Sequence, residues 1–280
     1  MPQIKKILFP VDFSESCIGA ARYVEAIAGK FEAEITLLHA VAMGERTLPQ
    51  ELLPLRKKEL DAFLADELKY YTTHRVCEIE DDPVAAIVDE ARSWGADLVM
   101  LPTHGLGFFR RHLLGSVTAK ALHDLDCPVW TSVHAEVAPP LEDIHCRRIL
   151  YATALDSCSR HVLRWASWLA GQYDASLGIV YATVAIDPAV ASVNIEEEFN
   201  RQVSAQVEKR IAELQTQAGT SASDVFIGPG KPEAVVAQAV SDYGADLLVI
   251  GRHNGSGIDG HAFRNAYGIL RESPCPVISI

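Results

Sequence analysis

The residues best suited to chemistry lie between positions 98 and 122, where a strand, a glycine-bearing loop and a helix follow one another in LVMLPTHGLGFFRRHLLGSVTAKAL. The apolar run 98–101 is typical of a buried strand in a parallel sheet. Gly105 allows backbone conformations closed to other residues, and Gly115-Ser116 begins a helix for which Ser116 is the expected N-cap. Free amide groups and the positive end of the helix dipole would meet there. This arrangement favours the binding of phosphate.

Charged side chains in the same loop have simpler explanations. Arg110 and Arg111 could neutralise phosphate charge, although an exposed charged pair is more often only solvated. His104 and His112 raise the question of a metal site, but no third protein ligand lies near them in the sequence. We therefore expect no metal held by the protein, and a Mg²⁺ ion would be carried by the phosphates of a ligand.

The elements around this loop alternate between short apolar strands and amphipathic helices. We expect strands in the first half at 7–11, 35–38, 76–79, 98–101 and 127–131. A surface helix is expected over 50–71 with Pro54 in its first turn, and Pro83 should begin another helix. Such alternation predicts an α/β fold with a doubly wound parallel sheet. Asp12, just after the first strand, would then face the glycine loop at the edge where strand order reverses.

The second half of the chain repeats the first. Three pairs of segments match in the same order: KKILFPVDFS at 5–14 with RRILYATALD at 147–156, GADLVML at 95–101 with GADLLVI at 244–250, and DCPVWTS at 126–132 with PCPVISI at 274–280. A duplicated domain follows, with domains over 1–135 and 145–280 and a linker between them that carries Pro139-Pro140.

The last strand of each half would lie at a sheet edge. An open apolar edge invites pairing with another strand, so we expect CPVWTS and CPVISI to pair with each other. The chain would then be a pseudo-two-fold unit, an intrachain pseudo-dimer that could pair again into a homodimer. Separately expressed halves that are stable, monomeric and do not associate would contradict this expectation.

The spacing of the glycines points to a family more clearly than their number does. Gly105, nine intervening residues and Gly115-Ser116 resemble the second part of the G-x2-G-x9-G-S/T motif of the universal stress protein family. ILFPVDFSES at 7–16 and LLHAV at 37–41 are similar to the first and second strands of that family. The resemblance covers nearly the whole chain twice, as in tandem members. It implies a Rossmann-like sheet of five parallel strands in each half, in the order 3-2-1-4-5.

The resemblance also implies a binding site for ATP or another adenine nucleotide in the first half. Asp12 would contact the adenosine portion, the backbone of Val41 the adenine edge, and Ser116 a phosphate. The full set of binding residues is Pro10, Val11, Asp12, Val41, Pro102, Thr103, His104, Gly105, Gly115, Ser116 and Val117. The chain departs from the family at Pro102, where the motif has glycine, because proline has no N–H to offer a ligand. For Asp12, the alternative is a role in capping the helix that begins near Ser14.

The second half has diverged at the positions that match this site. Asp12 is matched by Ala154, Gly105 by Asn254 and Gly115-Ser116 by Phe263-Arg264, while Gly251 stands where the first half has Pro102. We expect the scaffold of this half to survive and its pocket to be lost, so that one nucleotide binds per chain. The G-x-G-x-x-G pattern at 255–260 is expected to be a loop and not a dinucleotide fingerprint, because only one strand follows it before Ile280.

Composition excludes several classes of function. A net charge of −12 argues against nucleic acid or an anionic membrane as a partner. No apolar run approaches the roughly 20 residues that a membrane span needs, and the N-terminus enters a strand directly, so a cytoplasmic protein is expected. The six cysteines form no C-x-x-C pair, as expected of reduced thiols.

Two functions remain from these observations. One is a cytosolic stress-response regulatory protein that binds ATP in its first half, with a protein partner that the sequence does not identify. The other is a protein-interaction scaffold that binds no nucleotide. No P-loop, G-x-S-x-G motif or general base can be identified, so we expect no catalytic residues and at most slow ATP hydrolysis.

Overall fold

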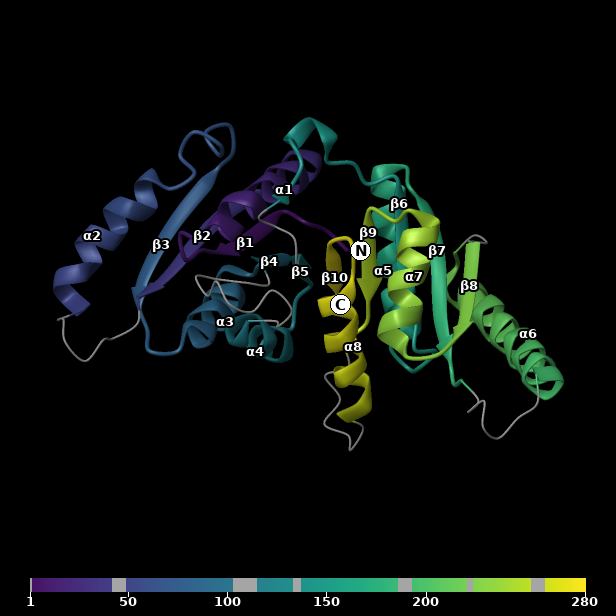
Figure 1. Cartoon of the computed structure of the whole chain (residues 1–280). Helices are drawn as coiled ribbons and strands as arrows, with labels where there is room; N and C mark the ends of the chain where they lie inside the picture. Colours follow the sequence, from purple (N-terminus) through teal and green to yellow (C-terminus); the bar gives the residue numbers. More distant parts are fainter. Residues whose placement is uncertain are drawn as a thin grey trace. The chain divides into compact units, whose positions relative to one another are not determined.

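The computed structural model describes residues 2–41, 49–102, 115–132, 137–185, 193–220, 224–252 and 260–280. It divides into two compact units, Met1–His145 and Cys146–Ile280, and each unit contains a five-stranded sheet flanked by helices (Figure 1). Among the helices of the described segments, none combines the length and the apolar character needed to cross a membrane.

The first unit follows the predicted alternation of strands and helices. Its elements are β1 (Lys6–Pro10), α1 (Glu15–Phe31), β2 (Glu34–Val41), α2 (Pro49–Ala62), β3 (Thr73–Ile79), α3 (Pro83–Trp94), β4 (Leu98–Pro102), α4 (Ser116–Asp124), β5 (Val129–Ser132) and the 3-10 helix η2 (Leu141–Asp143). The strands lie in the order β3-β2-β1-β4-β5, and all four pairings are parallel. The predicted fold class and strand order are confirmed.

The second unit has the same topology. Its elements are β6 (Arg148–Ala152), α5 (Ser159–Tyr173), β7 (Ser176–Thr183), α6 (Val193–Ala218), β8 (Asp224–Pro229), α7 (Pro232–Tyr243), β9 (Leu247–Ile250), α8 (Gly260–Glu272) and β10 (Val277–Ser279). Its order, β8-β7-β6-β9-β10, repeats that of the first unit with β6 in the place of β1, and these pairings are also parallel.

Local sequence signals account for where the helices begin and end. Asp82 accepts a hydrogen bond from the amide of Val84 and so caps α3, with Pro83 in the first position that suits proline. Gly95 then ends α3 in the left-handed conformation, with φ of 71°. Strand β4 is buried along its whole length, and its Leu98 and Val99 have no exposed surface. Burial on both faces explains why this strand shows no alternation in the sequence.

The expected helix over 50–71 needs two corrections. It ends at Ala62, and the residues that follow form turns in which Leu64 has a φ of 54°. Leu64 is nevertheless buried, so the apolar stripe is continued by a turn and not by a helix. Pro54 lies inside α2 and not in its first turn, because the helix begins at Pro49, a residue type that favours the first helical position.

Candidate functional site

The strand order of the first sheet reverses beside β1. This strand pairs with β2 on one side and with β4 on the other, so that Ile7 lies between Ile35 and Leu98. After β1, the chain adds β2 and β3 on one side of this strand and then β4 and β5 on the other side. In open α/β sheets, ligands bind at the carboxyl edge beside such a reversal, which here is the edge formed by the ends of β1 and β4.

The start of α4 is tied to the end of β4. The hydroxyl of Thr118 donates a hydrogen bond to the carbonyl of Pro102 at 3.2 Å, in buried surroundings. Ser116 is not the N-cap that we expected: Gly115 holds that position, and Ser116 is the first helical residue. Since glycine has no side chain, no capping side chain accepts hydrogen bonds from the first-turn amides at this position. The side chain of Ser116 is exposed, and within the described residues no capping side chain competes with an anion for these amides.

The turn after β1 orients the carboxylate of Asp12. Oδ1 of Asp12 accepts one hydrogen bond from the amide of Ser14 and another from the thiol of Cys17, each at 3.1 Å. Asp12 does not cap α1, because Ser14 holds that position and accepts from the amide of Cys17. Within the described residues, Oδ2 of Asp12 accepts no hydrogen bond. One carboxylate oxygen is therefore committed to the turn, and the other is available to a ligand.

No sequence signal connected Cys17 with Asp12. The side chain is 2% exposed. Burial, followed by the charge of Asp12, raises the pKa of the Cys17 thiol to about 12. The thiol is therefore neutral at physiological pH and donates its hydrogen to Asp12.

A cluster of aromatic rings lies beside the Asp12 turn, and the sequence did not predict it. His39, in β2, bonds through Nδ1 to the carbonyl of Val11 at 2.8 Å, and since a carbonyl only accepts, Nδ1 carries the hydrogen. The ring of Phe13 lies 4.4 Å from that of His39 and 5.1 Å from that of Phe63. The guanidinium of Arg56 lies 6.0 Å from the centre of the Phe13 ring. The only sequence signal for this group was the place of His39 in the predicted second strand.

The described part of the predicted site comes from three strand ends and the start of one helix. Pro10, Val11 and Asp12 end or follow β1, Val41 ends β2, Pro102 ends β4, and Gly115, Ser116 and Val117 begin α4. Thr103, His104 and Gly105, with Arg110, Arg111 and His112, lie outside the described residues. A search of the described segments finds no group of three or more acidic, histidine or cysteine side chains that could hold a metal.

The corresponding turn of the second unit keeps its backbone and changes its chemistry. Leu155 has a φ of 54°, close to the 62° of Phe13 at the matching position. The acidic residue is now Asp156, whose Oδ1 accepts from the amides of Cys158 and Ser159, both at 3.0 Å, and from the Ser159 hydroxyl at 2.8 Å. The carboxylate of Asp156 therefore stabilises the start of α5, and it lies two residues after Ala154, the residue that matches Asp12.

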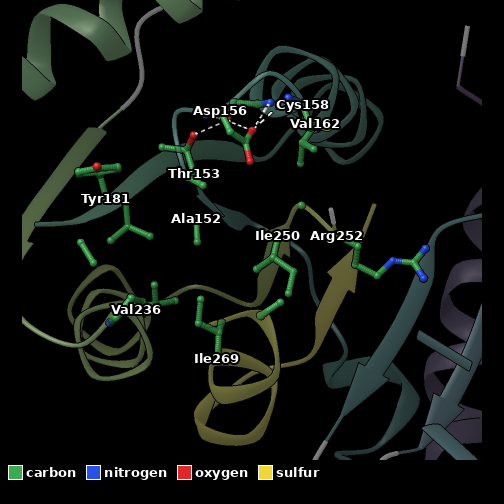
Figure 2. A pocket seen from close by; sticks show the side chains of 17 residues that line it. Ala152, Thr153, Asp156, Cys158, Val162, Tyr181, Val236, Ile250, Arg252 and Ile269 are labelled. Carbon is green, nitrogen blue, oxygen red and sulfur yellow. Dashed lines mark hydrogen bonds between the residues drawn. The ribbon is translucent and has the colours of Figure 1, made fainter. Parts of the chain in front are cut away.

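The second unit retains a cavity where we expected the nucleotide pocket to be lost. A cavity of about 220 Å³ lies at the carboxyl ends of β6, β7 and β9 (Figure 2). Ala152, Ala154 and Gly251 line it, and by sequence they replace Pro10, Asp12 and Pro102. Each of these three residues is smaller than its counterpart in the first unit, so the replacements leave space at this position. Asn254 lies outside the described residues, as does the glycine pattern at 255–260 except for Gly260, which begins α8.

Comparisons with known proteins agree with the duplicated fold. The sequence pattern of the Universal stress protein family matches residues 3–132 and again residues 145–280. Universal stress protein MJ0531 of Methanocaldococcus jannaschii is 32% identical over 139 residues, which cover 45% of this chain and 79% of that protein. Universal stress protein MJ0577 of the same organism is 30% identical over 149 residues, which cover 45% of this chain and 92% of that protein.

Among solved structures, a universal stress protein from Archaeoglobus fulgidus matches the full length of the chain. The TM-score is 0.69 at 18% identity, and the alignment covers 99% of this chain and 96% of that one. At this identity the likeness shows a common fold. The two matches to the family pattern, together with the repeated topology, establish that the chain belongs to the universal stress protein family as a tandem, two-domain member.

Proposed function

We propose that the chain is a cytoplasmic stress-response regulatory protein that binds one adenine nucleotide, ATP, at the carboxyl edge of the first sheet. Membership of the family makes an adenine nucleotide the expected ligand. The observation that carries the proposal is the hydrogen bond between Thr118 and Pro102, which holds the uncapped start of α4 at the end of β4. The start of α4 and the Asp12 carboxylate would then both face a ligand bound at the carboxyl edge beside β1.

Each part of the nucleotide meets suitable chemistry in this arrangement. The amides and the Ser116 hydroxyl at the start of α4 suit the phosphates, where the helix dipole also favours negative charge. Oδ2 of Asp12 would accept a hydrogen bond from the adenosine portion. The carbonyl of Val41 accepts from the amide of Glu80 at 3.1 Å, and its second lone pair is suited to the adenine edge. A Mg²⁺ ion would be carried by the phosphates.

Pro102 weakens one contact in this site. It lacks an amide hydrogen, and its carbonyl already accepts from Thr118. The end of β4 would therefore hold the start of α4 in place and donate no amide hydrogen bond from Pro102 to a ligand. This observation favours the alternative function, in which the chain is a protein-interaction scaffold that has lost nucleotide binding.

Mass spectrometry of the protein purified without added nucleotide separates the two functions. We expect an adenine nucleotide to be retained, or to bind with one-to-one stoichiometry when ATP is added. Absence of both retention and binding would favour the scaffold. Incubation of the protein with ATP over hours, with the amount of ADP measured, would detect hydrolysis. We expect hydrolysis to be slow at most, because the predicted site offers no identifiable general base.

A further inference from the structure

We propose that the cavity of the second unit binds a neutral, flat aromatic ligand and is not a second nucleotide site. This inference does not depend on nucleotide binding by the first unit. It rests on the lining of the cavity, on the hydrogen bonds among its polar groups and on its volume.

The walls of the cavity are mainly aliphatic. They are supplied by strand ends and by three helices, and the side chains include Ala152, Val162, Val180, Val236, Ile250 and Ile269 (Figure 2). Val162, Val236 and Ile250 are each at most 3% exposed, so they belong to the packed core of the unit. An apolar ligand would replace water against these walls and gain the free energy of apolar burial.

The hydroxyls at the edge of the cavity are already hydrogen bonded to their neighbours. Thr153 Oγ1 accepts from the amide of Leu155 at 3.1 Å and donates to Ser159 Oγ at 3.2 Å. Ser159 Oγ in turn donates to Asp156 and accepts from its amide. A base with several ring nitrogens would bring polar atoms that these groups cannot satisfy without breaking existing bonds, and a buried, unsatisfied polar group is costly.

The charges around the cavity do not suit a phosphate. Of the residues that line it, Asp156 and Arg252 are the two that carry full charges at neutral pH. The carboxylate of Asp156 lies at the rim and would repel an anion, whereas the guanidinium of Arg252 points away from the cavity (Figure 2). The matching edge of the first unit differs, since within the described residues Oδ2 of Asp12 accepts no hydrogen bond and the start of α4 lacks a capping side chain.

The volume and one aromatic wall define the shape of the ligand. Since an apolar cavity of about 150 Å³ accommodates benzene, a cavity of about 220 Å³ has room for about two fused rings. Tyr181, which takes the place of His39, lines the cavity and offers an aromatic surface for an offset or edge contact. A neutral bicyclic compound of the size of indole meets these requirements.

Calorimetric titration of the full chain with indole tests the proposal. We expect one indole to bind per chain, with an affinity that saturating ATP leaves unchanged. Adenine has a similar bicyclic size but a polar edge, and we expect it to compete with indole at least tenfold more weakly. AMP should not displace indole at all, whether or not it binds to the first unit.

Two cavity-filling variants locate the site. Ala152→Leu and Ala266→Leu place extra carbons into the cavity from β6 and from α8, and each should weaken indole binding at least tenfold. Ala234→Leu makes the same change on the exposed surface of α7 and should leave the affinity unchanged. The midpoint of thermal unfolding identifies any variant that has failed to fold.

Three results would overturn the proposal. The first is an absence of indole binding to the wild-type chain. The second is binding of adenine or AMP to this cavity with an affinity equal to that of indole, which would indicate a second nucleotide site. The third is unchanged indole affinity in both filling variants when these are folded, because the bound indole would then lie elsewhere. None of these results bears on ATP binding by the first unit.

Discussion

The thiol of Cys17 donates a hydrogen bond to Oδ1 of Asp12 across 3.1 Å. Asp12 lies in the connection between β1 and α1, whereas Cys17 lies in the first turn of α1 and its side chain is buried. Together with the amide of Ser14, it fixes one oxygen of the carboxylate and leaves the other available to a ligand. In the second unit Ser159 makes the equivalent contact to Asp156, at 2.8 Å, so both units brace an acidic side chain from this helix position.

Removing the Cys17 thiol should therefore weaken nucleotide binding through Asp12. We expect Cys17→Ala to lower the affinity for ATP by about 0.5–1.5 kcal/mol, the net value of one hydrogen bond. Cys17→Ser keeps a donor and should retain most of the affinity. Ser159→Ala is the matched control in the second unit and should leave ATP binding unchanged. Equal affinities of wild type and Cys17→Ala in calorimetry would show that the thiol does not position Asp12.

Asp12→Ala removes the proposed contact itself. We expect a loss of about 1.5–3 kcal/mol in ATP affinity, the range for a hydrogen bond to a charged group. The loss in unfolding free energy should be smaller, because Ser14 caps α1 independently of Asp12. Parallel titration and thermal unfolding decide the matter. A loss of stability with unchanged affinity would mean that Asp12 serves only the turn.

Pro102→Gly should restore an amide donor beside the phosphates. We expect ATP to bind modestly more tightly, by about 0.5–1.5 kcal/mol, because one additional hydrogen bond becomes available. Thr118 should keep its bond to the carbonyl of residue 102, since glycine also has that carbonyl. Weaker binding by this variant would indicate that the rigidity of proline shapes the site.

The raised pKa of Cys17 should make the free energy of unfolding fall as the pH rises through the alkaline range. Its folded value of about 12 lies above the ordinary 9.0, because burial disfavours the thiolate. Between these values the unfolded chain has lost a proton that the folded chain retains, so unfolding becomes easier as pH rises. From pH 9 to pH 11 the thiol should contribute a loss of roughly 2–3 kcal/mol in unfolding free energy. Denaturant unfolding of wild type and Cys17→Ala should therefore converge or cross with rising pH, and a constant difference would contradict the assigned shift.

Local patterns predicted most of the strands and helices, whereas the strand order 3-2-1-4-5 was implied only by the resemblance to the family. The apolar run from Leu98 and the proline at Pro83 each indicated an element boundary that the structure contains within a few residues. Errors arose where two signals of the same kind competed. Pro49 and Pro54 both suit the beginning of a helix, and sequence reasoning chose the second.

The site was less predictable because its decisive features are contacts across the turn and volumes between elements. The sequence shows that Cys17 is apolar in its spacing, but not that its sulfur reaches Asp12 five residues earlier. Likewise, the replacement of Asp12 by Ala154 and of Gly105 by Asn254 in the second half suggested a lost pocket. The volume set free by Ala154 and Gly251 could be recognised only once the surrounding walls were known.

The most direct test of one nucleotide site per chain is the stoichiometry of ATP binding in wild type, Gly115→Asp and Arg264→Asp. A side chain and a negative charge at position 115 would occupy the start of α4 where phosphate approaches. We predict one ATP per wild-type chain, no detectable binding by Gly115→Asp, and nearly unchanged affinity in Arg264→Asp. Two equivalent sites in the wild-type titration, or a full site that survives in Gly115→Asp, would contradict the assignment of the nucleotide to the first unit.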